Sequence, residues 1–220
     1  MRKIVLVANT KGGVGKTTLA QHFLLPALGK AIYVDTDTYN SSIGKVENSK
    51  HLVKAIKLRA VISKGDEEKA ALSRLAREFA ELFEKEVSDN IVIDTGGGTT
   101  ASAVLQALMP AFPEEISMVF IPASEDKVNL EKTVGFVSAF TDRYVIVNMR
   151  KEIYDTKLFI PEIPDSYLDL ALRHKITLPE IKDLKPEDLN LVDRGLRNLF
   201  ARLFKQEIDK AIEDIREVLS

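Results

Sequence analysis

The residues best suited to chemistry lie near the amino terminus, in the segment Asn9-Thr10-Lys11-Gly12-Gly13-Val14-Gly15-Lys16-Thr17-Thr18. The apolar run 4–8 precedes this segment, and the apolar helical pattern 19–25 follows it. A strand, a glycine-rich turn and a helix start in succession bring backbone N–H groups together around an anion. In such a loop Lys16 would contact the β- and γ-phosphates of a nucleotide, and the Thr17 hydroxyl would reach a Mg²⁺ ion. The sequence therefore predicts a site for a nucleoside triphosphate.

This loop departs from the common phosphate-loop pattern at two positions. The position five residues before Gly15, which the pattern fills with glycine, is Thr10, and an additional lysine, Lys11, directly precedes the glycine pair. A glycine-rich turn with solvated lysines and no ligand is the alternative interpretation. Three glycines, two lysines and the pair Thr17-Thr18 at a strand-to-helix junction disfavour it.

Acidic residues follow two further apolar runs. Asp35 and Asp37 come after the run 31–34, and Asp94 comes after the run 91–93. Ligands of parallel sheets bind beyond the carboxyl ends of the strands, so these acids and the glycine loop are expected to form one site. Asp94 suits the acid that holds Mg²⁺ through a water, while Asp35 or Asp37 could orient an attacking water or support the metal. The alternatives are helix capping for Asp94 and loop capping for the pair.

The short apolar runs alternate with helical patterns along most of the chain. We expect strands at residues 4–8, 31–34, 91–93, 116–121 and 144–147, and helices ending before Gly29 and near 66–87, 99–108 and 125–140. This alternation predicts an α/β protein with a single doubly wound, mainly parallel sheet and helices on both faces. One domain is expected to span residues 1–220, because a chain of 220 residues suits one such unit.

The carboxyl-terminal part of the chain has a different pattern. Apolar residues repeat at helical spacing along one stripe: Leu196, Leu199, Phe200, Leu203, Phe204, Ile208, Ala211, Ile212, Ile215 and Leu219. We therefore expect a helical segment over 185–220 that packs on the domain, with contact to a partner or a membrane as alternatives. The acidic residues that end the stripe disfavour binding to anionic lipid.

Composition excludes several classes of site. The chain has no cysteine, which excludes disulfides, thiolate metal sites and cysteine nucleophiles, and its three histidines lack metal-ligand spacing. No apolar run approaches the roughly 20 residues of a membrane span, and we expect a cytoplasmic protein. A net charge of −2 gives no overall attraction to nucleic acid.

Residues 41–64 carry six lysines and arginines against one glutamate. We interpret this run as a solvated helix face, with an anion or DNA contact as the alternative.

The quoted motifs resemble those of one family. The segment 9–18 is similar to the deviant Walker A box of the ParA/MinD ATPases, in which Lys11 would be the signature lysine. These proteins drive plasmid and chromosome partition, division-site selection and the positioning of large complexes. Asp35-Thr36-Asp37 resembles their second motif, Ile93-Asp94 the end of the Walker B strand, and Ile163-Pro164-Asp165, with Ala171 and Ile176, the segment near the adenine. The resemblance spans about residues 1–180 and favours the small plasmid-type members.

The resemblance implies a homodimer that encloses ATP and Mg²⁺. Lys11 would reach the phosphates of the partner, Lys16 those of its own site, and Asp37 would position the hydrolytic water. Thr17, Asp35 and Asp94 would hold the metal. The nucleotide contacts implied in this way are Lys11, Gly12, Gly13, Val14, Gly15, Lys16, Thr17, Thr18, Asn148, Arg150, Pro164 and Asp165. The sequence departs from the family after Asp37, where Thr38-Tyr39-Asn40 replaces the usual Pro-Gln pair, and after Asp94, where Thr95-Gly96-Gly97-Gly98 replaces a loop with proline.

The leading hypothesis is therefore a weak ATPase that dimerises on ATP and positions DNA or a protein cargo. A partner protein, such as a centromere-binding adaptor, would stimulate it, and nonspecific DNA is a subsidiary contact. The alternatives are a MinD-like protein that positions a division site or a complex, a metabolic ligase or kinase on the same scaffold, and a nucleotide-dependent binding module with negligible hydrolysis.

Overall fold

We describe the fold from a computed structural model of the chain. It describes residues 2–38, 41–47, 49–60, 66–87, 89–123, 127–148, 151–153, 157–159, 176–177 and 199–220. Within these residues no helix is long and apolar enough to cross a membrane.

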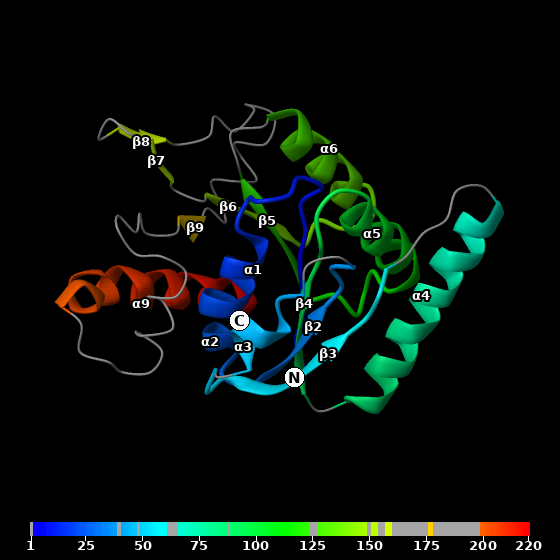
Figure 1. The fold of residues 1–220 in the computed structure, drawn as a ribbon, viewed down its shortest axis with the longest axis horizontal. Coiled ribbons are helices and arrows are strands. Elements are labelled where there is room, and N and C mark those ends of the chain that lie inside the picture. Colours follow the sequence, from blue (N-terminus) through cyan, green and yellow to red (C-terminus); the bar gives the residue numbers. More distant parts are fainter. Residues whose placement is uncertain are drawn as a thin grey trace.

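The centre of the protein is a seven-stranded sheet with the strand order β3-β2-β4-β1-β5-β6-β9, in which every neighbouring pair is parallel (Figure 1). Its strands are β1 (Ile4–Val7), β2 (Ala31–Asp35), β3 (Leu52–Lys57), β4 (Asn90–Asp94), β5 (Met118–Ala123), β6 (Tyr144–Asn148) and β9 (Ile176–Thr177). Strands β7 (Lys151–Ile153) and β8 (Lys157–Phe159) form a separate antiparallel pair. The central strand β1 is buried along its whole length, which explains why its sequence is apolar at every position.

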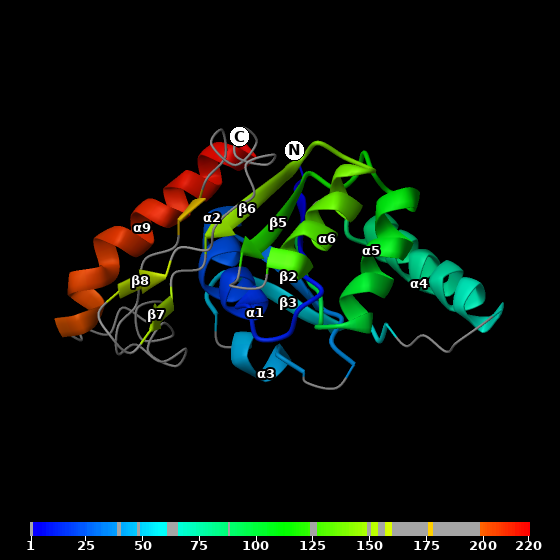
Figure 2. The same ribbon diagram turned by 90° about the horizontal axis from the view of Figure 1, so that it is seen from above.

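Helices cover both faces of the sheet, as the two views show (Figures 1 and 2). One face packs against α4 (Asp66–Lys85), α5 (Thr99–Ala111) and α6 (Lys127–Ser138). The other face packs against the amino-terminal helix and α9 (Leu199–Leu219). The amino-terminal helix runs as α1 (Lys16–Leu19), a π-helical segment η1 (Ala20–Leu24) and α2 (Leu25–Leu28), and α3 (Ile43–Val46) is one short turn. The predicted doubly wound α/β architecture is thus confirmed.

Strand β3 corrects the interpretation of the positive run 41–64 as a helix face. Residues 52–57 form the edge strand of the sheet and pair in parallel with β2. Both lysines in this strand are engaged in ion pairs, Lys54 with Glu86 and Lys57 with Asp35. Only part of the positive charge of the run is therefore available to an external anion.

Helices form at 66–85 and 199–219, and apolar residues are buried along the described part of each. In α4 the buried residues include Leu75, Phe79 and Leu82, whereas Val87, at the end of the predicted helix 66–87, lies beyond the observed helix and is 69% exposed. Among the residues of α9 whose burial is described, 209–219, the buried ones are Ala211, Ile215 and Leu219. They belong to the same apolar cluster as the amino-terminal helix, beside which α9 lies. Residues 178–198, which include the beginning of the predicted 185–220 segment, lie outside the described residues.

Candidate nucleotide-binding site

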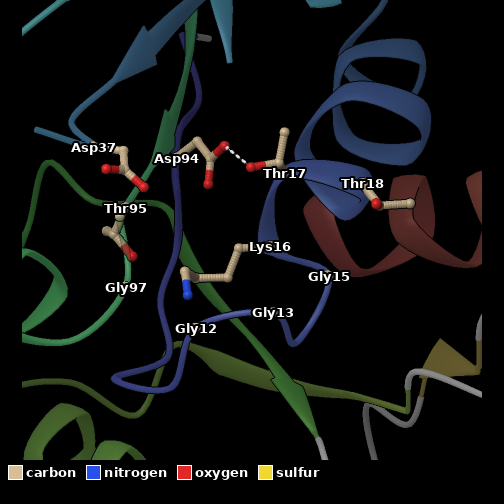
Figure 3. Close-up of a pocket in the computed structure, with 11 residues that line it drawn as sticks. Gly12, Gly13, Gly15, Lys16, Thr17, Thr18, Asp37, Asp94, Thr95 and Gly97 are labelled. Carbon is tan, nitrogen blue, oxygen red and sulfur yellow. Dashed lines mark hydrogen bonds between the residues drawn. The ribbon is translucent and has the colours of Figure 1, made fainter. Parts of the chain in front are cut away.

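A cleft of about 520 Å³ opens at the carboxyl ends of the central strands. It is lined by residues from three segments that are far apart in the sequence, namely Gly12, Gly13, Gly15, Lys16, Thr17, Thr18, Asp37, Asp94, Thr95, Gly96 and Gly97. Figure 3 shows Lys16 between the glycine turn and the segments that carry Asp37 and Asp94. The structure therefore brings together six residues of the predicted phosphate loop and two of the three predicted acids. Lys11, Val14 and Asp35 are not among the residues that line this cleft.

The glycine turn has the backbone that a phosphate loop needs. Gly13 and Gly15 have φ angles of 72° and 90°, in the left-handed region that side chains with a Cβ rarely adopt. Gly15 is also the N-cap of α1, so the turn leads directly into a helix start. The side chain of Asn9, which is fully buried, holds the turn by accepting a hydrogen bond from the Lys11 N–H and donating one to the Pro122 carbonyl. The loop is thereby fixed to the end of β5.

Lys16 lies almost buried in the cleft, with 6% of its surface exposed. Its ammonium group donates a hydrogen bond to the backbone carbonyl of Lys11 at 2.7 Å. Burial lowers the pKa of Lys16, and the negative charges of Asp94 and Asp37 partly oppose this effect. An anion bound within the glycine turn would replace the carbonyl as the partner of the ammonium group and would favour its charged form.

Thr17 and Asp94 form the second element of the site. The Thr17 hydroxyl donates a hydrogen bond to Asp94 Oδ2 at 2.7 Å (Figure 3). Asp94 is 3% exposed, and burial raises the pKa of its carboxyl to about 6. The other carboxylate oxygen, Asp94 Oδ1, and the neighbouring Thr95 hydroxyl are buried without a hydrogen-bond partner among the described residues. Two buried oxygen atoms at the cleft thus remain able to accept or donate a hydrogen bond, or to contact a cation.

These oxygens provide a test of whether the predicted Mg²⁺ fits the site. Mg²⁺ prefers oxygen ligands and is usually bound by one or two protein groups together with substrate phosphates and waters. The Thr17 hydroxyl, Asp94 Oδ1 and the adjacent glycine turn meet this requirement. A dedicated protein cage is not needed for such an ion, and the described part of the chain contains no cluster of three or more histidine or acidic residues that could form one.

The two acids of the second motif differ in their surroundings. Asp37 lines the cleft, as predicted for the residue that orients water. Asp35 is 1% exposed, and its carboxylate accepts hydrogen bonds from the backbone of Asp37 and Ser42, the Ser41 hydroxyl and the Lys57 ammonium group. These donors hold the turn that carries Asp37. They favour a structural role for Asp35 over the predicted role as a metal ligand.

The segment 96–98 lies directly against the phosphate loop and the Asp37 turn. The Gly98 N–H donates a hydrogen bond to the Thr10 carbonyl at 2.7 Å. A Cβ on Gly97 would lie 3.1 Å from Gly12 Cα, and a Cβ on Gly96 would lie 3.0 Å from Asp37 Cα. Only residues without a side chain allow this approach without a shift of the neighbouring backbone. The glycines that depart from the family pattern therefore join the three strand ends into one compact site.

Several predicted contacts to the nucleotide base remain predictions. Asn148 ends β6 and pairs in register with Thr177 of β9. Arg150, Pro164 and Asp165 lie outside the described residues.

Sequence reasoning missed some side chains that support the site. Tyr33, Ser42 and Lys57 contact the acids, and Asn9 holds the glycine turn. A tyrosine within the otherwise apolar run 31–34 was the one visible signal for the first of them. Lys57 was not singled out, because it is one of several lysines in a positively charged run and because the strand that contains it was not predicted.

Solved structures show which known fold this architecture matches. No family model matches the sequence, and neither does any curated protein. McdA of Cyanothece, in its apo form, is similar with a TM-score of 0.56, 17% identity and coverage of 100% of both chains. The septum site-determining protein MinD of Pyrococcus horikoshii, complexed with Mg-ADP, has a TM-score of 0.55 and 18% identity and covers 99% of this chain and 97% of its own.

A plasmid partition protein of Borrelia burgdorferi is similar with a TM-score of 0.52 and 19% identity, over 94% of this chain and 100% of its own. These similarities extend over nearly the whole described architecture rather than the phosphate loop alone. The chain therefore has the fold of the ParA/MinD family.

Proposed function

We propose that this protein is an ATP-dependent switch that binds Mg-ATP, dimerises around the nucleotide, hydrolyses it weakly and positions DNA or a protein cargo. The observation that carries this proposal is the meeting, in one cleft, of the Lys16 ammonium group, the Thr17–Asp94 pair and Asp37. Phosphoryl transfer needs little covalent chemistry from the protein, because positioning and charge stabilisation supply most of the rate enhancement. These residues supply both.

Phosphate binding would begin at the glycine turn. The N–H groups at the start of α1 would donate hydrogen bonds to the phosphates, and Lys16 would exchange the Lys11 carbonyl for a phosphate oxygen. Because Lys16 is already buried, it would need no further desolvation when the anion arrives. Its attraction to the phosphates would act in a cleft where water screens it little.

Thr17 and Asp94 would hold the metal that accompanies ATP. Mg²⁺, when bound, would neutralise the negative charge that develops on the phosphate oxygens. The Thr17 hydroxyl oxygen can contact a cation while its proton remains donated to Asp94 Oδ2. Asp94 Oδ1 would accept a hydrogen bond from a metal-bound water or contact the ion directly.

Asp37 is the residue we assign to the attacking water. Its turn is held by the Asp35 carboxylate and by Lys57, whose ammonium group donates to the Asp37 backbone carbonyl. A rigid turn would fix the carboxylate relative to the phosphates, as efficient hydrolysis requires. We expect the isolated protein to hydrolyse ATP slowly and a partner to complete the site.

Dimerisation is inferred from Lys11. A second lysine directly before the glycine turn could supply its charge across an interface, where it would stabilise the transition state as an arginine finger does. The names of the similar structures, a plasmid partition protein, McdA and the septum site-determining MinD, support a positioning role for this chain. They favour it over a metabolic ligase or kinase.

The proposal can be tested by measuring the mass of the protein in solution with Mg-ATP. We expect Asp37→Ala to accumulate as an ATP-bound dimer because hydrolysis is blocked, and Lys16→Ala to lose nucleotide binding. Lys11→Ala should bind ATP with near-normal affinity yet remain monomeric. A monomeric Asp37→Ala protein at saturating Mg-ATP would overturn the dimer switch. ATP turnover that requires a small carboxylate or amine substrate would favour the ligase alternative instead.

The cargo can be tested separately. Since Lys54 and Lys57 are engaged in ion pairs, a DNA contact would depend on the other positive residues of the run. If DNA is bound, log K should fall linearly with log salt, with a slope of about −0.9 per phosphate contact. Failure of the ATP-bound dimer to shift duplex DNA at low salt would leave a protein cargo as the remaining form of the proposal.

A further inference from the structure

Tyr33 is a polar group in the middle of the sheet that the proposed reaction does not yet use. It lies in β2, where it pairs in register with Val92 of β4, and it is fully buried. Its ring belongs to the apolar cluster beneath the amino-terminal helix. Its hydroxyl lies 2.5 Å from Asp94 Oδ2 and 2.6 Å from the Ser42 hydroxyl. A buried tyrosine needs one hydrogen-bond partner, and this one has two.

The protons in this chain of hydroxyls can be assigned from the acceptors. Ionised Asp94 can only accept, so Tyr33 donates to Oδ2, and Ser42 must then donate to the Tyr33 oxygen. Oδ2 also accepts the Thr17 hydroxyl proton. Two donors therefore converge on one oxygen of Asp94, while the other oxygen, Oδ1, has no partner among the residues that the structure describes.

Ser42, at the end of this series of hydrogen-bonded hydroxyls, is itself held in place by backbone hydrogen bonds. Its backbone N–H donates to Asp35 Oδ2 at 2.8 Å, and its carbonyl accepts from Gln21 at 3.4 Å. Asp35 and Asp94 are register partners on β2 and β4. The turn after β2, which positions Asp37, is thus connected through Ser42 and Tyr33 to the acid of β4.

Without the Tyr33 hydroxyl, Thr17 would be the one hydrogen-bond donor to Asp94 among the described residues. The carboxylate could then rotate about its terminal torsion, which has a broad energy profile. The positive charge of Lys16, which interacts with Asp94 across the cleft, would attract both oxygens. The Tyr33 hydrogen bond opposes this rotation.

We propose that Tyr33 is a positioning residue for the metal ion: its hydroxyl fixes Asp94 Oδ2, so that Oδ1 stays directed at the Mg²⁺ of bound Mg-ATP. This inference rests on the proposed function, because it presumes that Mg-ATP binds in the cleft. Groups that orient metal-binding residues typically change metal affinity or activity about 10–100-fold when removed. If loss of the hydroxyl weakens Mg²⁺ binding by that factor and leaves the affinity for the nucleotide unchanged, Tyr33 positions the metal-binding residue rather than only packing in the core.

The test compares Tyr33→Phe with the wild-type protein and with Tyr144→Phe. The Phe variant at 33 removes the hydroxyl and keeps the ring. Tyr144 is also nearly buried, but it begins β6, whereas the cleft opens at the carboxyl ends of the strands. Binding of a fluorescent, non-hydrolysable ATP analogue is measured in EDTA, and then as a function of Mg²⁺ at fixed analogue. Mn²⁺ titration followed by electron paramagnetic resonance gives a second measure of metal binding.

We expect Tyr33→Phe to raise the half-saturating Mg²⁺ concentration about 10–100-fold, while its analogue affinity in EDTA and both values for Tyr144→Phe stay within about twofold of wild type. An unchanged Mg²⁺ midpoint in Tyr33→Phe would overturn the inference. An equal loss of affinity with and without Mg²⁺ would also overturn it, because it would show a general structural role. If Tyr33→Phe does not fold, Tyr33→Met, which also removes the hydroxyl and fills the apolar site with a flexible side chain, is judged by the same criteria. If the wild-type protein itself shows no Mg²⁺ response, the proposed function fails instead.

Discussion

Asp35 and Asp94 face each other on neighbouring strands, yet the same substitution is expected to change stability in opposite directions. Both are buried and in register on β2 and β4. Asp35 accepts hydrogen bonds from four donors, including the Lys57 ammonium group at 3.0 Å. Asp94 accepts from two hydroxyls on one oxygen and leaves the other oxygen without a partner among the described residues. Replacing each aspartate by asparagine is the same chemical change, so any difference in its effect on stability reflects the different hydrogen-bonding surroundings of the two side chains.

The magnitude for Asp94 follows from its pKa. Burial raises this pKa from 3.8 to about 6, so the folded protein binds the proton more tightly than the unfolded chain does. Stability is then highest when the carboxyl is protonated and falls as the pH rises through about 4 to 6. A shift of this size corresponds to about 3 kcal/mol of destabilisation at neutral pH. An asparagine avoids this destabilisation but places an unpaired amide at the Oδ1 position, which costs about 1–2 kcal/mol.

We therefore expect Asp94→Asn to stabilise the nucleotide-free protein by about 1–2 kcal/mol at pH 8. Since unfolding of a domain of this size shifts by about 2–4 °C per kcal/mol, the melting temperature should rise by about 2–8 °C. The gain should disappear toward pH 5, where the wild-type carboxyl is largely protonated. Asp35→Asn should instead lower stability by about 1.5–3 kcal/mol, because an amide cannot accept all four donors.

The assay is urea and thermal unfolding of the three proteins in EDTA without nucleotide, at several pH values from 5 to 8. Addition of Mg-ATP should reverse the order of wild type and Asp94→Asn, because only the wild-type protein gains stability from tight metal-nucleotide binding. If Asp94→Asn were less stable than wild type at pH 8, or if their difference did not vary with pH, the desolvation argument would be refuted.

Two further predictions concern the contacts around Asp37 and the glycine turn. Gly97→Ala should weaken nucleotide binding by about 1–3 kcal/mol, since the added Cβ would lie 3.1 Å from Gly12 Cα; Gly135→Ala, where a Cβ meets nothing within 4 Å, is the matched control in a titration with nucleotide. Lys57→Met should lower the single-turnover rate of ATP hydrolysis about tenfold or more with unchanged ATP affinity, because it releases the turn that carries Asp37. Equal losses of rate and affinity would assign Lys57 to general stability instead.

The parts of the fold that could be predicted from the sequence are those determined by local pattern. The glycine turn follows a buried strand and begins a helix, so its context is written within about 20 consecutive residues. The central strands are buried on both faces and therefore appear as continuous apolar runs. Helices α4 and α9 could also be predicted from local pattern, because apolar residues repeat at helical spacing along one face of each.

Strand β3 could not be recognised because it forms the edge of the sheet. Its burial is only partial, Val53 is 46% exposed, and its lysines interrupt the apolar pattern. Charged residues are common on edge strands, where they discourage pairing with other chains. The same lysines, taken together, indicated a solvated surface, and the sequence contained no sign that Lys57 binds Asp35 and the Asp37 turn.

The contacts within the site could not be predicted from the sequence either, because they join residues that are far apart along the chain. Tyr33 lies 61 residues from Asp94 in the sequence. Gly97 packs so closely against Gly12 that a Cβ on Gly97 would lie 3.1 Å from Gly12 Cα. Such contacts depend on strand order and register, which determine which strand ends meet. The apolar run 31–34 indicated burial for Tyr33 but not the direction of its hydroxyl.

The structure of the site connects its stability with its ligand. On one side of the cleft, hydrogen bonds hold the backbone in place: Asn9 holds the glycine turn, and Gly98 donates to Thr10. The other side retains two buried oxygens, on Asp94 and Thr95, that have no partner within the described part of the chain. Buried polar atoms without partners are rare because each costs about 1–3 kcal/mol. A ligand that completes their bonds should therefore stabilise the protein beyond the effect of filling a cleft, and nucleotide with Mg²⁺ should stabilise it more than the same nucleotide in EDTA.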